Sequence, residues 1–204
     1  MPVVGPESLG EVASALARGD VVAIPTETVY GLAARADDRE AVGRMAMLKG
    51  RPSGQPFQLL VEPVEAVLPL LADAGALERV RALWPGPLTA VVRARAGAGL
   101  AVVTEQGTVG VRQPDDALAR AVIEAAGGVI AATSANLSGE DPATTARDVV
   151  RRFGGELLVL DGGERGGLSP STVVDLTRDP PVLLRAGPIT AGELGIRGPS
   201  PPSA

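Results

Sequence analysis

Short apolar runs alternate with amphipathic segments along most of this chain, and that alternation limits its possible folds more than any other feature. Helical spacing of apolar residues predicts helices at 7–18, 38–48, 115–128 and 145–155, with two shorter helices within 63–84. Buried strands are expected at 20–25, 57–62, within 85–94, at 108–114, from 129 into a polar loop ending at 144, and at 157–162, 171–176 and 181–185. This order predicts an α/β fold whose sheet is mixed but mostly parallel, with helices on its faces.

Length and composition favour one domain. The chain has 204 residues, of which 45% are hydrophobic, enough for a single sizeable core. We expect that domain to cover 1–197, and the Pro- and Ser-rich tail 198–204 to be disordered. No apolar run approaches the roughly 20 residues that span a bilayer, and the first residues do not resemble a secretory signal. A cytoplasmic location without membrane contact is the expectation.

Cysteine and histidine are both absent, which excludes several kinds of chemistry. No disulfide, zinc–thiolate site, Ser-His-Asp triad or Cys-His pair can form. An enzyme of this composition would depend on carboxylates, Lys, Arg, hydroxyls, backbone amides or groups of its substrate. The net charge of −5 disfavours non-specific adhesion to nucleic acid.

Polar clusters follow several of the expected strands. They read "PTETVYGL" at 25–32, "VRQP" at 111–114, "TSANLSG" at 133–139 and "LLRAGP" at 183–188. Ligands of α/β proteins often bind where strands end, so these clusters predict a polar small-molecule site. Lys49 and Arg51 lie close together on a Gly/Pro loop and are candidates for binding phosphate. Solvated surface charge for that pair and a helix cap for "TSAN" remain alternatives.

No Walker loop and no Gly-rich dinucleotide-binding turn occurs in the sequence. The acidic residues are also scattered rather than clustered. If a nucleotide binds, we expect Mg²⁺ to be held mainly by its phosphates.

Seven motifs together resemble the YrdC-like threonylcarbamoyl-AMP synthases, over nearly the whole chain and in that family's order. They are "PTETVYGL" at 25–32, "KGRP" at 49–52, "WPGPLT" at 84–89, "VGVRQP" at 109–114, "ATSANLSG" at 132–139, "STVVDL" at 171–176 and "LLRAGP" at 183–188. The resemblance implies the short, single-domain form of the family, with a twisted mixed sheet and an open substrate groove.

The resemblance also implies a reaction. Such enzymes make threonylcarbamoyl-AMP and pyrophosphate from ATP, L-threonine and bicarbonate or CO₂. The product would pass to proteins that transfer the threonylcarbamoyl group to tRNA, so tRNA would be an indirect partner. Because a carbamate formed on threonine can attack the α-phosphorus directly, no protein nucleophile is needed.

The family's site residues carry over to ten positions. Lys49 and Arg51 resemble the catalytic pair that faces the phosphates. Further ATP contacts are implied for Thr108, Ser134, Asn136 and Arg185. The threonine site would comprise Thr28, Arg112, Ser171 and the backbone at Ala132. Two alternatives stay open: a paralogue with different carbamoyl chemistry, of the YciO or hydrogenase-maturation type, and an RNA-binding module without catalysis.

Overall fold

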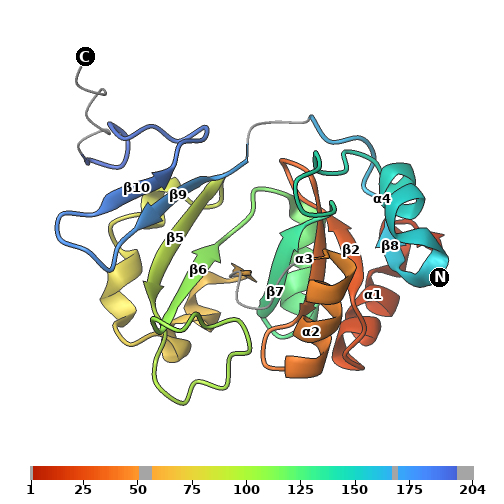
Figure 1. The fold of residues 1–204 in the computed structure, drawn as a ribbon, viewed down its shortest axis with the longest axis horizontal. Coiled ribbons are helices and arrows are strands. Elements are labelled where there is room, and N and C mark those ends of the chain that lie inside the picture. Colours follow the sequence, from red (N-terminus) through yellow and green to blue (C-terminus); the bar gives the residue numbers. More distant parts are fainter. Residues whose placement is uncertain (1, 51–56, 167–169, 197–204) are drawn as a thin grey trace.

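A computed structural model describes residues 2–50, 57–166 and 170–196 (Figure 1). Within them one ten-stranded sheet runs in the order β1-β8-β2-β3-β7-β4-β6-β5-β9-β10. Its strands are β1 Val3–Val4, β2 Val22–Pro25, β3 Tyr30–Arg35, β4 Gln58–Val61, β5 Leu88–Arg93, β6 Thr108–Arg112, β7 Val129–Ser134, β8 Leu158–Leu160, β9 Thr172–Asp175 and β10 Val182–Arg185. The expected tail at 198–204 lies outside the described residues.

The sheet is mixed, as predicted, but it is not mostly parallel. Four strand pairings are parallel and five are antiparallel. The difference arises largely at β3, which the sequence analysis treated as part of a polar loop. Residues 26–29 reverse the chain, so β3 pairs antiparallel with both β2 and β7. The hydroxyl-rich motif is therefore a hairpin turn between two buried strands.

In the described part of the chain, four α-helices cover the sheet: α1 Leu9–Ala17, α2 Arg39–Leu48, α3 Ala117–Ala125 and α4 Ala146–Phe153. Side-chain oxygens cap three of them at the N-terminus, from Asp38, Asp116 and Thr145. Met47, in the last turn of α2, is 73% exposed.

Residues 63–84 form no α-helix. They make four short 3₁₀ segments, at Val64–Ala66, Leu68–Leu70, Ala74–Leu77 and Arg81–Leu83. Pro69 and Gly75 interrupt the helical pattern, which explains why no longer helix develops.

Apolar side chains pack on both faces of the sheet. Helices α1 and α3 touch each other and bury Leu16 and Ile123 against one face, whereas α2 and α4 bury Met45 and Phe153 on the other. All four α-helices gather around β2, β3, β7 and β8, while β5, β6, β9 and β10 form the other half of the molecule (Figure 1). No described helix is long and apolar enough to cross a membrane.

Candidate functional site

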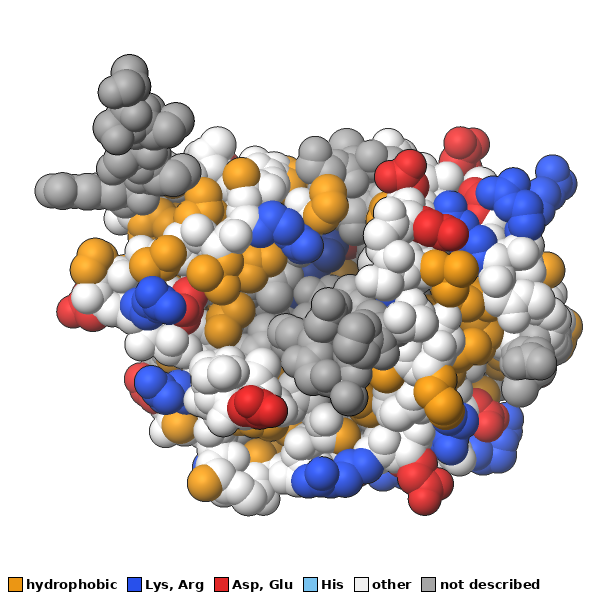
Figure 2. All heavy atoms as spheres, in the orientation of Figure 1, with side chains coloured by type: hydrophobic (Ala, Val, Ile, Leu, Met, Phe, Trp, Pro, Cys, Tyr) orange, Lys and Arg blue, Asp and Glu red, His pale blue; other side chains and the backbone are white. Residues whose placement is uncertain are grey.

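A pocket of about 660 Å³ opens between the two halves of the molecule. Strands from both halves line it, with β3 and β7 on one side and β5, β9 and β10 on the other. Figure 2 shows the molecule hollowed on this face, with basic side chains at the upper edge of the hollow. The volume lies in the range typical of sites for small molecules.

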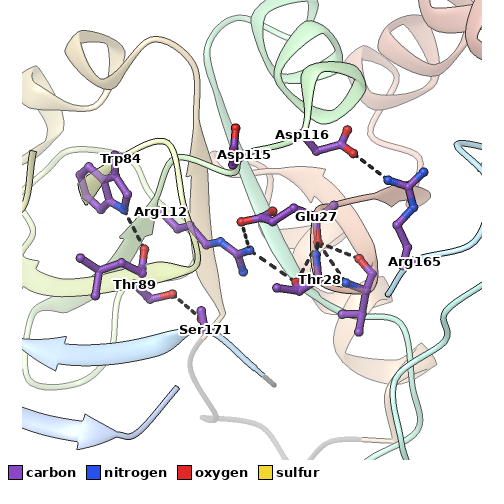
Figure 3. Close-up of polar contacts among 12 residues, drawn as sticks. Glu27, Thr28, Trp84, Thr89, Arg112, Asp115, Asp116, Arg165 and Ser171 are labelled. Carbon is purple, nitrogen blue, oxygen red and sulfur yellow. Dashed lines mark hydrogen bonds and ion pairs between the residues drawn. The ribbon is translucent and has the colours of Figure 1, made fainter. Parts of the chain in front are cut away.

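Arg112, at the end of β6, provides a buried positive charge in this pocket. Its side chain is only 5% exposed. Nη2 donates to Glu27 Oε1 at 2.6 Å and to Thr28 Oγ1 at 3.4 Å (Figure 3). Within the described residues, Arg112 Nε and Glu27 Oε2 are buried without a hydrogen-bond partner. A guanidinium with an unused N–H is suited to binding a further acceptor, such as a carboxylate.

Arg185, at the end of β10, borders the same pocket. Its Nε donates to Ser171 O at 2.9 Å and its Nη2 to Ser171 Oγ at 3.0 Å. Burial, and after it the positive charge of Arg112, lower the pKa of the Arg185 guanidinium. The positive charges of Arg112 and Arg185 repel each other, so an anion bound between them would be favourable.

Polar side chains continue from Ser171 across the sheet. Ser171 Oγ lies 2.9 Å from Thr89 Oγ1 (Figure 3), and Thr89 Oγ1 donates to Gln58 Oε1 at 2.9 Å. Thr89, Ser171 and Gln58 all line the pocket.

Lys49 follows α2 and is fully buried. Its Nζ donates to Ser134 O at 2.7 Å and to Asn136 Oδ1 at 2.8 Å. The Asn136 amide nitrogen in turn donates to Leu137 O and Glu140 O. Lysine and asparagine thereby hold the loop that follows β7 in one conformation.

The structure brings most of the predicted site residues together. Six of the ten line the pocket: Thr28, Arg112, Ala132, Ser134, Ser171 and Arg185. Lys49 and Asn136 are not among the lining residues, but both form hydrogen bonds with the Ser134 hydroxyl. Thr108, at the start of β6, is not among the lining residues, and its hydroxyl pairs with that of Thr104 at 2.7 Å. Arg51 lies outside the described residues.

Several polar residues of this site were not in the predicted set, among them Glu27, Gln58 and Thr89. Glu27 holds Arg112, and Gln58 and Thr89 line the pocket. A signal for Gln58 existed: it is a polar residue in the otherwise apolar run 57–61, at intermediate exposure between buried neighbours. Glu27 and Thr89 lay inside quoted motifs, but their roles depend on neighbours distant in sequence.

Comparison with known sequences identifies relatives. The family model Sua5_yciO_yrdC, described as telomere recombination, matches residues 14–187. A threonylcarbamoyl-AMP synthase of Pyrococcus abyssi is 39% identical over 180 residues, which are 86% of this chain and 53% of that protein. One from Chromohalobacter salexigens is 37% identical over 83% of this chain and 93% of that protein. The chain thus spans about half of the first relative and nearly all of the second.

Solved structures agree with the fold. P. abyssi Sua5 complexed with L-threonine superposes with a TM-score of 0.88 at 35% identity, covering 95% of this chain and 60% of that one. Escherichia coli YciO gives a TM-score of 0.83 at 25% identity, covering 93% of each chain.

Proposed function

Because this chain belongs to the Sua5/YciO/YrdC family, we propose that it is an L-threonylcarbamoyladenylate synthase. It would join L-threonine, bicarbonate or CO₂, and ATP into threonylcarbamoyl-AMP, releasing pyrophosphate. The observation that carries the proposal is the pair of arginines at one pocket lined with hydroxyls, Arg112 at the end of β6 and Arg185 at the end of β10. The names of the relatives and the threonine complex of P. abyssi Sua5 support it.

Arg112 binds the carboxylate of threonine in this proposal. Its buried guanidinium has an N–H without a partner among the described residues, and a carboxylate supplies the missing acceptor. Thr28 lies beside it and reads the substrate hydroxyl, with Ser171 and the Ala132 backbone completing the threonine site. Arg112 accordingly orients the amine that must take up CO₂.

The nucleotide lies toward Ser134 and Arg185. Arg185, Lys49 and Arg51 offset the negative charge that builds up when a carbamate oxygen attacks the α-phosphorus and pyrophosphate leaves. Lys49 already donates to the loop carrying Ser134, so its charge acts on the phosphates from a fixed position. Asn136 and Thr108 complete the proposed ATP contacts.

Mg²⁺ is the proposed cofactor. Within the described residues no group of three acidic side chains is placed to hold a metal by itself. Among the pocket-lining residues that the structure describes, Asp141 is the one carboxylate. One carboxylate together with substrate phosphates is a common way for proteins to bind Mg²⁺, so this donor set fits the ion, which supplies charge neutralisation at the phosphates.

The product would be consumed by proteins that transfer the threonylcarbamoyl group to tRNA, in the cytoplasm. The chain itself would meet tRNA only indirectly. Its net charge of −5 and its 2% aromatic content support this over direct RNA binding.

Pyrophosphate release is the direct test. The chain is incubated with ATP, Mg²⁺, bicarbonate and each amino acid in turn, and again with EDTA. We expect pyrophosphate to be released only when L-threonine and bicarbonate are both present. We also expect EDTA to stop the release. ATP turnover without a threonine requirement would favour a paralogue of the YciO type, which the family model includes by name, or one of the hydrogenase-maturation type. RNA binding without turnover would favour the non-catalytic module.

A further inference from the structure

We propose that Gln58 is an additional substrate-binding residue, whose side-chain amide donates to a carboxylate-type oxygen in the pocket. The inference rests on the proposed function and extends it, because Gln58 belongs neither to the predicted threonine contacts nor to the ATP contacts. It is carried by the hydrogen bond that Thr89 donates to the carbonyl oxygen of Gln58, which leaves the amide NH₂ group for a ligand.

An arginine side chain can only donate, and a hydroxyl has a single proton to donate. Arg185 Nη2 donates to Ser171 Oγ at 3.0 Å. Thr89 has one hydroxyl proton and donates it to Gln58 Oε1 at 2.9 Å. In the 2.9 Å hydrogen bond between Ser171 and Thr89, Ser171 must therefore be the donor. The hydroxyls of Ser171 and Thr89 therefore both donate their hydrogen bonds in the direction that leads from Arg185 to Gln58.

This series of hydrogen bonds ends at the carbonyl oxygen of the Gln58 amide, which accepts from Thr89. With that oxygen held by Thr89, the amide NH₂ of Gln58 is turned away from Thr89 while the side chain lines the pocket. Two N–H donors on a neutral group suit an oxygen that carries negative charge.

Gly110 makes this arrangement possible. Gln58 is on β4 and Thr89 on β5, and the two strands are separated by β6. Gly110 pairs with Gln58 across the sheet, and a Cβ on it would lie 3.0 Å from Thr89 Cγ2 and 3.6 Å from Gln58 Cβ. The missing side chain leaves the space in which Gln58 and Thr89 meet over the intervening strand.

Arg112 is two residues after Gly110, so it is on the same face of the sheet and lines the same pocket. The Gln58 amide and the Arg112 guanidinium thus offer donors to one ligand. Two oxygens of the proposed substrates have the required chemistry. One belongs to the carboxylate of L-threonine, and the other to the carbamate formed from bicarbonate.

Gln58→Glu is the sharpest variant, because it keeps the shape and the acceptor for Thr89 but replaces the donors with an anionic oxygen. We expect KM to rise roughly 10- to 100-fold for one substrate, the range for losing a hydrogen bond to a charged group. A rise in the KM and the calorimetric Kd of L-threonine assigns the oxygen to the amino acid. A rise in the KM of bicarbonate, with threonine binding unchanged, assigns it to the carbamate.

Two controls separate this role from a structural one. Gln106→Glu makes the same chemical change on an exposed turn and should leave both KM values unchanged. Thr89→Val removes the hydroxyl that orients Gln58, and Thr89→Ser keeps it. We expect the valine variant to raise the same KM as Gln58→Glu by several-fold, and the serine variant to restore it.

The inference is overturned if folded Gln58→Glu keeps both KM values and the threonine Kd of the wild type, or if Thr89→Ser is as impaired as Thr89→Val. Thermal melting shows which variants are folded. If Gln58→Glu is not folded, the comparison of Thr89→Val with Thr89→Ser decides whether the inference holds. A wild-type chain that makes no threonylcarbamoyl-AMP and does not bind L-threonine instead overturns the proposed function, and this inference with it.

Discussion

Asn136 uses all of its hydrogen-bonding capacity inside the protein. Its Oδ1 accepts from Lys49 and from Ser134, and its Nδ2 donates to Leu137 O and Glu140 O. An asparagine amide can take part in about four such bonds, so a direct contact with ATP would have to replace one of them. The direct ATP contact predicted for Asn136 therefore stays a prediction. In this structure the hydrogen bonds of Asn136 hold the loop after β7 in place, a role that we call a loop brace.

Replacing Asn136 therefore tests two roles at once. Asn136→Ala removes an acceptor from a fully buried lysine, so we expect the free energy of unfolding to fall by about 2–4 kcal/mol. Ser138→Ala changes an exposed side chain of the same loop and is the matched control. Denaturant unfolding gives the stability and calorimetry the ATP affinity. Unchanged stability with lost ATP binding would contradict the brace and favour direct contact.

Arg112→Lys tests the carboxylate clamp. A lysine keeps the charge but offers no planar fork, so we expect kcat/KM for L-threonine to fall by roughly tenfold or more. Arg120→Lys, at an arginine 30% exposed in its side chain and outside the lining residues, is the control. Wild-type kcat/KM in Arg112→Lys would rule the clamp out.

Secondary-structure elements are joined at this site by a few contacts between distant segments. Tyr30 begins β3, and its hydroxyl donates to Gly163 O at 2.8 Å and accepts from Gly162 N at 3.1 Å, which ties β3 to the segment after β8. On the other side, a Cβ on Gly187 would lie 2.4 Å from Thr172 N and 2.6 Å from Pro170 O. The segment after β10 can thus approach the backbone around Ser171 only because residue 187 is glycine.

Tyr30 is the single tyrosine of the chain, so its ionisation is directly observable. Burial is the largest cause that raises its pKa above the ordinary value. We expect tyrosinate absorbance to develop at higher pH in the native protein than in the denatured chain, which titrates near pH 10.

The same shift affects stability. The contribution of Tyr30 is fully present below the pKa of the unfolded chain and is lost as the pH rises toward the native pKa. Tyr30→Phe should remove this part of the alkaline loss, as measured by denaturant unfolding at several pH values. Coincident titration of native and denatured protein would refute the shift.

Gly187→Ala tests the contact between β10 and β9. Because the new methyl would meet backbone atoms, we expect a loss of about 1–3 kcal/mol in stability and weaker L-threonine binding through displacement of Ser171. Gly192→Ala has only a side-chain oxygen at 3.8 Å and should be nearly neutral. Equal stability and affinity in the two variants would show that the close approach is unimportant.

At the scale of the whole molecule, the pocket joins two halves that differ in construction. One half has α-helices on both faces, and the other has strands bordered by 3₁₀ segments (Figure 1). Thr28 comes from the first half and Ser171 and Arg185 from the second, so a ligand that fills the pocket would contact both. A ligand that binds only the folded molecule stabilises it by mass action.

Thermal melting with different amino acids measures that linkage. L-threonine at about 100 times its Kd should add about 2.7 kcal/mol to the stability. Serine loses a methyl group, worth about 0.8 kcal/mol, whereas valine leaves hydroxyl-binding groups unpaired at a cost of about 1–3 kcal/mol. We expect the stabilisation to decrease from threonine to serine to valine, with D-threonine as the stereochemical control. Valine equal to threonine would exclude a pocket that reads the hydroxyl.

The sequence by itself determined the α/β class, most helices and strands, and the residue types of the site, because these follow from local periodicity and from motifs in fixed order. It also placed Thr28, Ser134 and Arg112 at strand ends, where the structure has them around one pocket. The hairpin that makes β3 was missed, since its turn is rich in polar residues and only pairing with β7 reveals its second strand.

Only the tertiary structure decided how those residues are used. Lys49 looked like a surface loop charge or a phosphate ligand, yet the fold buries it against Ser134 and Asn136, residues 85 and 87 positions away. Gln58 and Thr89, separated by 31 positions, meet because the strand between them carries Gly110. Hydrogen bonding between side chains depends on distance in space, and folding sets that distance through strand order and register, which no local pattern in the sequence contains.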